Sequence, residues 1–112
     1  MTEKELANVR FTAGDITDAN AVKRSVIESG ATHIIHLGAL QVPFCKADPP
    51  LGAAVNVVGT ANMFEAAKEA GISQLVYASS IAVYGDNEFY STELLQHDSS
   101  LHPQTLYGVY KQ

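Results

Sequence analysis

The sequence contains a single cysteine, no long apolar run and little positive charge. One thiol, Cys45, cannot build a disulfide framework, so the sequence predicts a reducing compartment and a cytoplasmic protein. No apolar run approaches the ~20 residues of a membrane span, and the residues after Met1 lack the apolar core of a signal peptide. The net charge of −5 disfavours nucleic-acid binding, which needs a positive surface. We therefore expect neither a nucleic acid nor a membrane as a partner.

Patterns typical of metal centres and reactive thiols are also lacking. No histidine stands in an obvious base relationship to Cys45, which favours a loop or core thiol over a nucleophile. His36 lies in an apolar run and is interpreted as a packed strand residue rather than a ligand. No metal site is expected, because no ligand spacing joins the histidines, which are His33, His36, His97 and His102.

What the sequence does contain is sufficient for one folded domain. With 112 residues, one domain is the natural upper limit. Hydrophobic residues make up 46% and charged residues 17%, an ordinary balance for a globular α/β domain. Strand patterns alternate with helix patterns, which predicts βαβ crossovers and a parallel sheet of about three strands.

Turn and capping residues place the expected elements along the chain. Asp18 should cap a helix that ends at Gly30, and Gly71 should end a longer helix. Three prolines predict a loop over Leu40–Pro50, residues 84–103 are polar and irregular, and residues 105–112 should begin another helix. The expected helices are Asp18–Ser29 and Leu51–Ala70, and the expected strands are Val9–Ala13, Thr32–Leu37 and Gln74–Ala78.

Tyr107 and Lys111 are four residues apart in a segment that should be helical, so they would share one helix face. A free tyrosine, with a pKa of about 10, is a poor base at neutral pH unless a nearby ammonium favours the phenolate. The pair therefore suits acid–base chemistry. The alternative interpretation is a surface pair without a role.

Polar or small residues follow the predicted strands, at the edge where parallel sheets bind ligands. The hydroxyls of Ser79–Ser80 could bond a substrate oxygen or could satisfy backbone groups. Asp15 could contact a ligand or serve as a turn residue. Gly38–Ala39 would let a ligand or another backbone approach. Asn56 needs a partner within its apolar helix, either a loop carbonyl or the active site.

Taken in order, these segments resemble the extended short-chain dehydrogenase/reductase family, which contains UDP-galactose 4-epimerases and dTDP-glucose dehydratases. The segments are GDI at 14–16, HLGA at 36–39, NVVGT at 56–60, ASSIAVYG at 78–85 and YGVYK at 107–111. They follow the family's order and spacing and cover the chain from Val9 to Lys111. Two departures are Gly38, where alanine is usual, and Tyr110, where serine is common.

The resemblance implies a partial Rossmann-like fold, an NAD or NADP cofactor and a nucleotide-sugar or related small-molecule substrate. Tyr107 would be the catalytic acid/base. Lys111 would favour its phenolate form and hold the nicotinamide ribose, and Ser80 would orient the reacting sugar carbon. The cofactor would also be lined by Asp15 and Ile16 at its adenine, by Leu37, Gly38 and Ala39 along its length, and by Asn56 near its nicotinamide.

The glycine-rich turn with which this family holds the cofactor's pyrophosphate is absent from the sequence. Residues 1–112 are thus expected to form part of a domain, without its N-terminal βαβ unit and its sugar-binding portion. In the family's strand order 3-2-1-4-5-6, Val9–Ala13 would lose the two strands that separate it from Thr32–Leu37. It could leave a gap, pair directly with that strand, or be paired by another chain, so a rearranged fold or a homo-oligomer is expected.

These observations leave three hypotheses open. The first is an internal part of an NAD(P)-dependent nucleotide-sugar epimerase or dehydratase, inactive alone. The second is a non-catalytic, Rossmann-like structural or interaction domain that keeps the segments above. The third is part of a related NAD(P)-dependent reductase.

We expect the isolated chain to bind NAD weakly or not at all, because no helix N-terminus preceded by a glycine-rich turn is available for the pyrophosphate. Calorimetric titration of the chain with NAD measures this directly. Micromolar or tighter binding would show that the phosphate-binding turn is dispensable.

Overall fold

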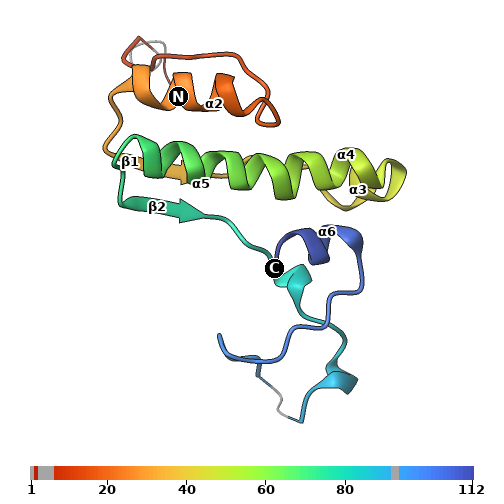
Figure 1. Ribbon diagram of the computed structural model, residues 1–112. Helices are drawn as coiled ribbons and strands as arrows, with labels where there is room; N and C mark the ends of the chain where they lie inside the picture. The colour runs from red at the N-terminus through yellow and green to blue at the C-terminus, as the bar shows by residue number, and fades with distance from the viewer. Residues whose placement is uncertain (1, 3–6, 92–93) are drawn as a thin grey trace.

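Two parallel strands form the centre of the fold, which a computed structural model describes for residues 2, 7–91 and 94–112. Strand β1 (His33–His36) pairs with β2 (Gln74–Tyr77), and His36 stands opposite Tyr77. The helices run along one face of this pair and past its carboxyl ends (Figure 1). The predicted parallel α/β fold is confirmed, and both strands lie within the predicted ranges.

The third predicted strand, Val9–Ala13, is wrong. This segment is unpaired, and its direct pairing with β1 does not form. Phe11 is 86% exposed, and the side chain of Arg10 bonds the Glu28 carbonyl at 3.2 Å. The implied strand order leaves two positions between this segment and β1, and the described part of the chain fills neither. The pattern of side chains predicts an extended segment, but such a segment becomes a strand only if it can pair with the edge of another strand.

Helix α2 (Ala19–Ser29) begins and ends where the capping residues predict. The Asp18 carboxylate accepts hydrogen bonds from the backbone N–H groups of Asn20 and Ala21, both at 3.0 Å. Gly30 follows the helix at φ 65°, a left-handed conformation that glycine adopts without strain. The helix packs against α5 (Gly59–Glu69) with Val22 buried between them.

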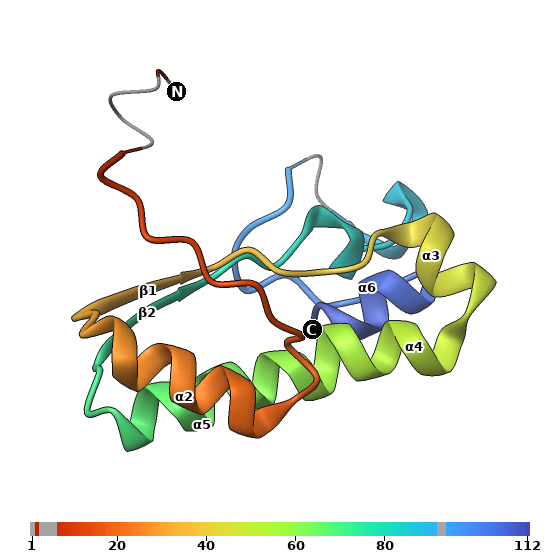
Figure 2. The ribbon, with the colours of Figure 1, turned by 90° about the horizontal axis from the view of Figure 1, so that it is seen from above.

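The predicted long helix is present but interrupted. It begins two residues early as α4 (Pro49–Ala53), continues as a π-helical segment (Ala54–Val58) and ends as α5. A π segment holds one extra residue per turn and often marks a functional region. The long helix therefore has two sections, one beside the sheet and one beyond it (Figure 2).

The predicted loop over Leu40–Pro50 is also wrong, because it contains helix α3 (Val42–Ala47). A proline breaks a helix interior, but its missing N–H costs nothing in the first turn. Pro43 lies in the first turn of α3, and Pro49 and Pro50 begin α4. The prolines therefore start two helices here.

The chain after β2 is mostly irregular, as predicted, until α6 (Leu106–Tyr110). Two single 3₁₀ turns, Ile81–Val83 and Asn87–Phe89, interrupt it. The Thr105 hydroxyl caps α6 by accepting the Gly108 N–H at 3.0 Å. The predicted start of a helix at residue 105 is thus confirmed.

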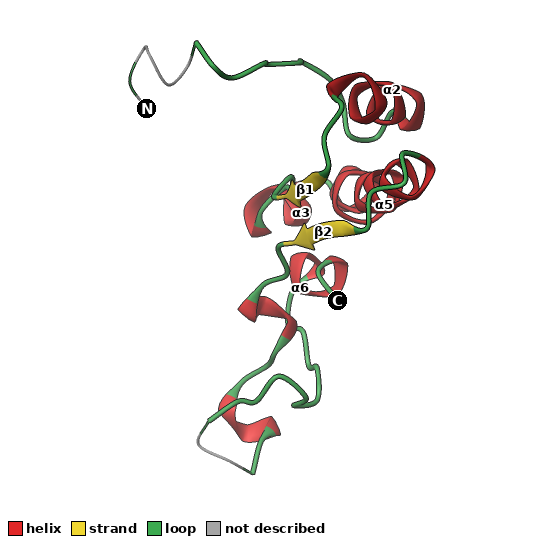
Figure 3. Ribbon diagram, turned by 90° about the vertical axis from the view of Figure 1, so that its left-hand side faces the viewer, coloured by secondary structure: helices red, strands yellow, loops and turns green. Residues whose placement is uncertain are grey.

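One face of the sheet is covered and the other is bare. Figure 3 shows α5 against one side of β1 and β2, whereas Ile35 and Val76, which point to the other side, are 71% and 63% exposed. The radius of gyration is 16.7 Å, against about 13 Å for a compact chain of 100 residues. This open shape is consistent with association, and a homo-oligomer stays a prediction. No helix among the described residues has the length and apolarity to cross a membrane.

We expect Asp18→Ala to lower the free energy of unfolding by about 1 kcal/mol, because two backbone N–H groups lose their acceptor. Urea unfolding measures the change. Asp86→Ala is the control, since Asp86 precedes the Asn87–Phe89 turn without a side-chain cap. It should change stability by less than about 0.5 kcal/mol. Equal losses in the two variants would contradict the capping role.

Candidate active site

The candidate residues gather beyond the carboxyl ends of β1 and β2. The parallel register brings the chain after β1 and the chain after β2 to the same edge. Helices α3 and α6 lie on this side of the strands (Figures 1 and 2). The ends of the two strands therefore lie on the same side of the fold as Lys111, the residue that follows α6.

Lys111 is buried and is held through both its side chain and its backbone. It is 3% exposed, and its ammonium donates to the Ala78 carbonyl at 2.7 Å. The backbone carbonyl of Lys111 accepts a bond from the Ser79 hydroxyl at 2.9 Å. Burial lowers the pKa of Lys111. Both ion pairs among the described residues lie elsewhere, so no carboxylate there neutralises this charge.

Tyr107 lies within reach of the same ammonium. The Lys111 nitrogen is 6.0 Å from the centroid of the Tyr107 ring, and Tyr107 is partly exposed. The spacing of four residues therefore places the two side chains together, as the sequence predicts. Their catalytic roles stay a prediction.

Ser80 is partly buried where β2 leads into the first 3₁₀ turn. Its hydroxyl oxygen accepts the Ala82 N–H at 3.2 Å, which begins that turn. The bond agrees with the prediction that a hydroxyl at this position could satisfy a backbone group. It leaves the hydroxyl hydrogen available to a ligand oxygen, so the two roles are compatible.

The amide of Asn56 ties the long helix to the chain after β1. Its oxygen accepts the Leu40 N–H at 2.7 Å, and its nitrogen donates to the Leu40 carbonyl at 2.8 Å and to the Cys45 sulfur at 3.4 Å. Asn56 is 1% exposed, and these bonds fix the backbone at Leu40, so the predicted loop carbonyl is its partner. Cys45 is fully buried and donates to the same carbonyl, as expected for a core thiol.

Asp15 and Ile16 form a second group at the other end of this edge. One Asp15 oxygen accepts both the N–H and the hydroxyl of Thr17, at 2.9 and 2.8 Å, and these bonds lower the pKa of Asp15. Ile16 lies over two glycines: a Cβ at Gly38 would come within 3.3 Å of its side chain, and one at Gly59 within 2.7 Å. A cavity of about 190 Å³ borders Asp15 and Ile16.

The two groups are linked through the chain after β1 rather than by direct contact. Gly38 meets Ile16 at one end, and the backbone of Leu40 meets Asn56 at the other. Ala39 is half-buried between these points, whereas Leu37 is 70% exposed. The predicted cofactor residues therefore follow one path, on which Leu37 is exposed.

An aromatic cluster beside Lys111, with a buried His36 and a half-buried Tyr77, was not anticipated from the sequence. The rings of His36 and Tyr77 stack with centroids 5.6 Å apart, and His36 shares a 3.0 Å hydrogen bond with the Thr60 hydroxyl. His36 is 3% exposed, which agrees with its interpretation as a packed strand residue. Burial, and then the nearby Lys111 charge, lower the pKa of His36. The sequence offered one indication of this contact: His36 and Tyr77 each lie near the end of a predicted strand, and the two strands were expected to pair.

Comparison with known proteins identifies the family. A sequence model of the NAD dependent epimerase/dehydratase family matches residues 1–112. The chain belongs to this family. It is 35% identical over 106 residues to D-erythronate dehydrogenase from Cupriavidus necator, covering 94% of this chain and 32% of that protein. It is 40% identical over 89 residues to human 3 beta-hydroxysteroid dehydrogenase type 7, covering 78% of this chain and 24% of that protein.

Solved structures of epimerases share the fold. The Thermus thermophilus UDP-glucose 4-epimerase, solved with NAD, superposes with a TM-score of 0.83 at 31% identity, covering 92% of this chain and 33% of that one. The chain thus spans about a third of the length of relatives in this epimerase/dehydratase family.

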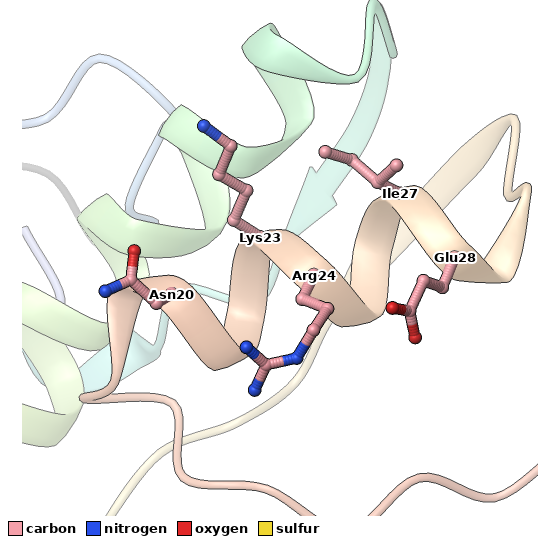
Figure 4. A pocket seen from close by; sticks show the side chains of 5 residues that line it. All are labelled: Asn20, Lys23, Arg24, Ile27 and Glu28. Atoms are coloured by element: carbon pink, nitrogen blue, oxygen red, sulfur yellow. The ribbon is translucent and has the colours of Figure 1, made fainter.

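Another cavity, of about 440 Å³, lies along α2 (Figure 4), and none of the candidate residues lines it. Its lining residues are Asn20, Lys23, Arg24, Ile27 and Glu28. In the described part of the chain, no group of three or more histidine, cysteine, aspartate or glutamate side chains could hold a metal ion.

We expect Gly108→Ala to displace α6 and lower the free energy of unfolding by about 1–3 kcal/mol. A Cβ at Gly108 would lie 2.1 Å from the Ala82 carbonyl oxygen, and backbone atoms cannot easily give way. Urea unfolding and the NMR signals of Tyr107 and Lys111 measure the two effects. Gly14→Ala is the control, because a Cβ there meets nothing within 4 Å. Unchanged Lys111 signals in Gly108→Ala would contradict the tight contact.

Proposed function

We propose that this chain carries the acid–base side of an NAD-dependent site that acts on a hydroxyl-bearing carbon of a nucleotide sugar or a related small molecule. One observation carries the proposal: a buried ammonium, Lys111, lies beside a partly exposed tyrosine, Tyr107, at the carboxyl ends of parallel strands. Membership of the epimerase/dehydratase family supports it.

Each of the three proposed catalytic residues has one task. Tyr107 takes the proton from the substrate hydroxyl and returns it in the reverse direction. The Lys111 ammonium favours the phenolate form that this transfer requires. Ser80 donates its hydroxyl hydrogen to the reacting oxygen and so orients the carbon that bears it. The bond from Ala82 fixes the Ser80 oxygen without using that hydrogen.

The described residues suit the two ends of a dinucleotide. When bound, NAD accepts or returns a hydride. At the nicotinamide end, Lys111 would bond the ribose, beside the backbone that Asn56 fixes. At the adenine end, both Thr17 bonds use one oxygen of Asp15, so the other can accept from the amine of the base. Between these ends, Gly38 lets His36 and Ile16 pack closely against the backbone after β1.

The same residues offer nothing for the pyrophosphate between those ends. Asp18 and Asp48 already satisfy N–H groups at the starts of α2 and α4, and their negative charges would repel phosphate. The Thr105 hydroxyl likewise satisfies an N–H group at the start of α6. A segment outside residues 1–112 would have to hold the phosphates, which supports our inference that the chain is inactive alone and binds NAD weakly.

Two relatives favour a second candidate, a dehydrogenase. D-erythronate dehydrogenase and 3 beta-hydroxysteroid dehydrogenase type 7 both exceed 30% identity to this chain. An epimerase returns the hydride to its substrate, whereas a dehydrogenase leaves reduced cofactor behind. Accumulation of reduced nicotinamide, followed by absorbance, distinguishes the two reactions.

In a protein that supplies the rest of the domain, Tyr107→Phe should lower turnover by roughly 10²–10⁴-fold, because a positioned acid–base group contributes about that much. Lys111→Met should lower turnover, weaken cofactor binding and move the pH optimum upward, since the phenolate is no longer favoured. Ser80→Ala should cost less. Steady-state kinetics over a range of pH measures all three.

Losses in the combined variants should be far less than multiplicative if the three residues act as a unit. Tyr84→Phe is a matched control, because it removes a phenolic hydroxyl that bonds the Gln96 carbonyl outside the site. Near-native turnover in Tyr107→Phe would refute the assignment of the whole group.

A further inference from the structure

We propose that Tyr77 is a positioning residue for Lys111: the face of its ring holds the ammonium, and His36 and Phe64 hold the ring. The Lys111 nitrogen lies 4.6 Å from the Tyr77 ring centroid, closer than its 6.0 Å distance from the Tyr107 centroid. The catalytic consequence rests on the function proposed above, whereas the contact itself does not.

A buried ammonium needs this support. Lys111 is 3% exposed and has the Ala78 carbonyl as a hydrogen-bond acceptor for its ammonium. No carboxylate in the described part of the chain lies within ion-pair distance of it. A cation within about 6 Å of an aromatic face is attracted by the ring, most strongly where water is excluded. Tyr77 provides the second stabilising contact that the carbonyl alone does not.

The Tyr77 ring is fixed on several sides. His36, its cross-strand neighbour in the register, stacks on it with an interplanar angle of 27°. Phe64 from α5 meets it edge-on, with centroids 6.5 Å apart. Thr60, one turn earlier on α5, bonds the imidazole of His36 and so holds that ring in place. Residues from β1 and α5 therefore hold a ring that β2 supplies.

The electrostatics of the cluster favour one charge, on the lysine. Burial and the Lys111 charge lower the pKa of His36, so the imidazole stays neutral at neutral pH. Burial raises the pKa of Tyr77, so the phenol also stays neutral. With both rings neutral, the ammonium meets the ring face without a competing charge. The cluster thus stabilises the Lys111 ammonium in one place, 6.0 Å from the centroid of the Tyr107 ring.

NMR of the chain labelled at lysine and tyrosine tests the contact without cofactor or substrate. The native chain should show nuclear Overhauser effects between the Lys111 ε-methylene and the Tyr77 ring, and an upfield ring-current shift of that methylene. Tyr77→Leu should abolish both the effect and the shift. Tyr77→Phe should keep the shift, because it keeps the ring and loses only the hydroxyl. Rescue by phenylalanine separates a ring-face contact from simple space filling.

Tyr110→Leu is the matched control, since Tyr110 bonds the Pro49 carbonyl through its hydroxyl and lies next to Lys111 in sequence. It should leave the ring-current shift unchanged. Should Tyr77→Leu fail to fold, the native spectrum decides alone: no Overhauser effect between the two side chains overturns the proposal. An upfield shift that persists in a folded Tyr77→Leu variant overturns it as well. Neither result depends on whether Tyr107 is catalytic.

Discussion

The parallel pairing of β1 with β2 is the constraint on which the site depends. Four residue pairs bring two carboxyl ends to one edge, and each candidate group then meets the chain that leaves that edge. Asn56 fixes the segment after β1, and the segment after β2 binds Lys111 through Ala78 and Ser79. Antiparallel pairing of the same strands would send these two segments to opposite ends of the sheet.

Local signals in the sequence predicted what local interactions determine. Asp18 and Gly30 mark the ends of α2 because the bonds and the backbone conformation involved lie within a few residues of each. Val9–Ala13 failed as a strand because strand formation depends on a distant edge. The prolines led to a wrong prediction of a loop over Leu40–Pro50 for a similar reason, since their effect depends on where a helix begins. The sequence therefore predicted the ends of α2 from local residues, but it did not predict which segments would pair with one another.

The candidate site divides in the same manner. The spacing of Tyr107 and Lys111 on one helix turn was readable, and so was the need of Asn56 for polar partners. The cluster of His36, Thr60 and Tyr77 was not, because it joins two strands and a helix that are separated by up to about forty residues of chain. The family resemblance supplied roles for motif residues only. It gave no account of the residues that support them.

The π segment at Ala54–Val58 has a consequence for the helix on either side. Successive residues of an α-helix turn by about 100°, so one extra residue puts the faces of α4 and α5 out of phase. The helix can then turn α5 toward the sheet and α4 toward α6. One long helix thereby packs against both the sheet and α6, which a single continuous face of an α-helix could not do.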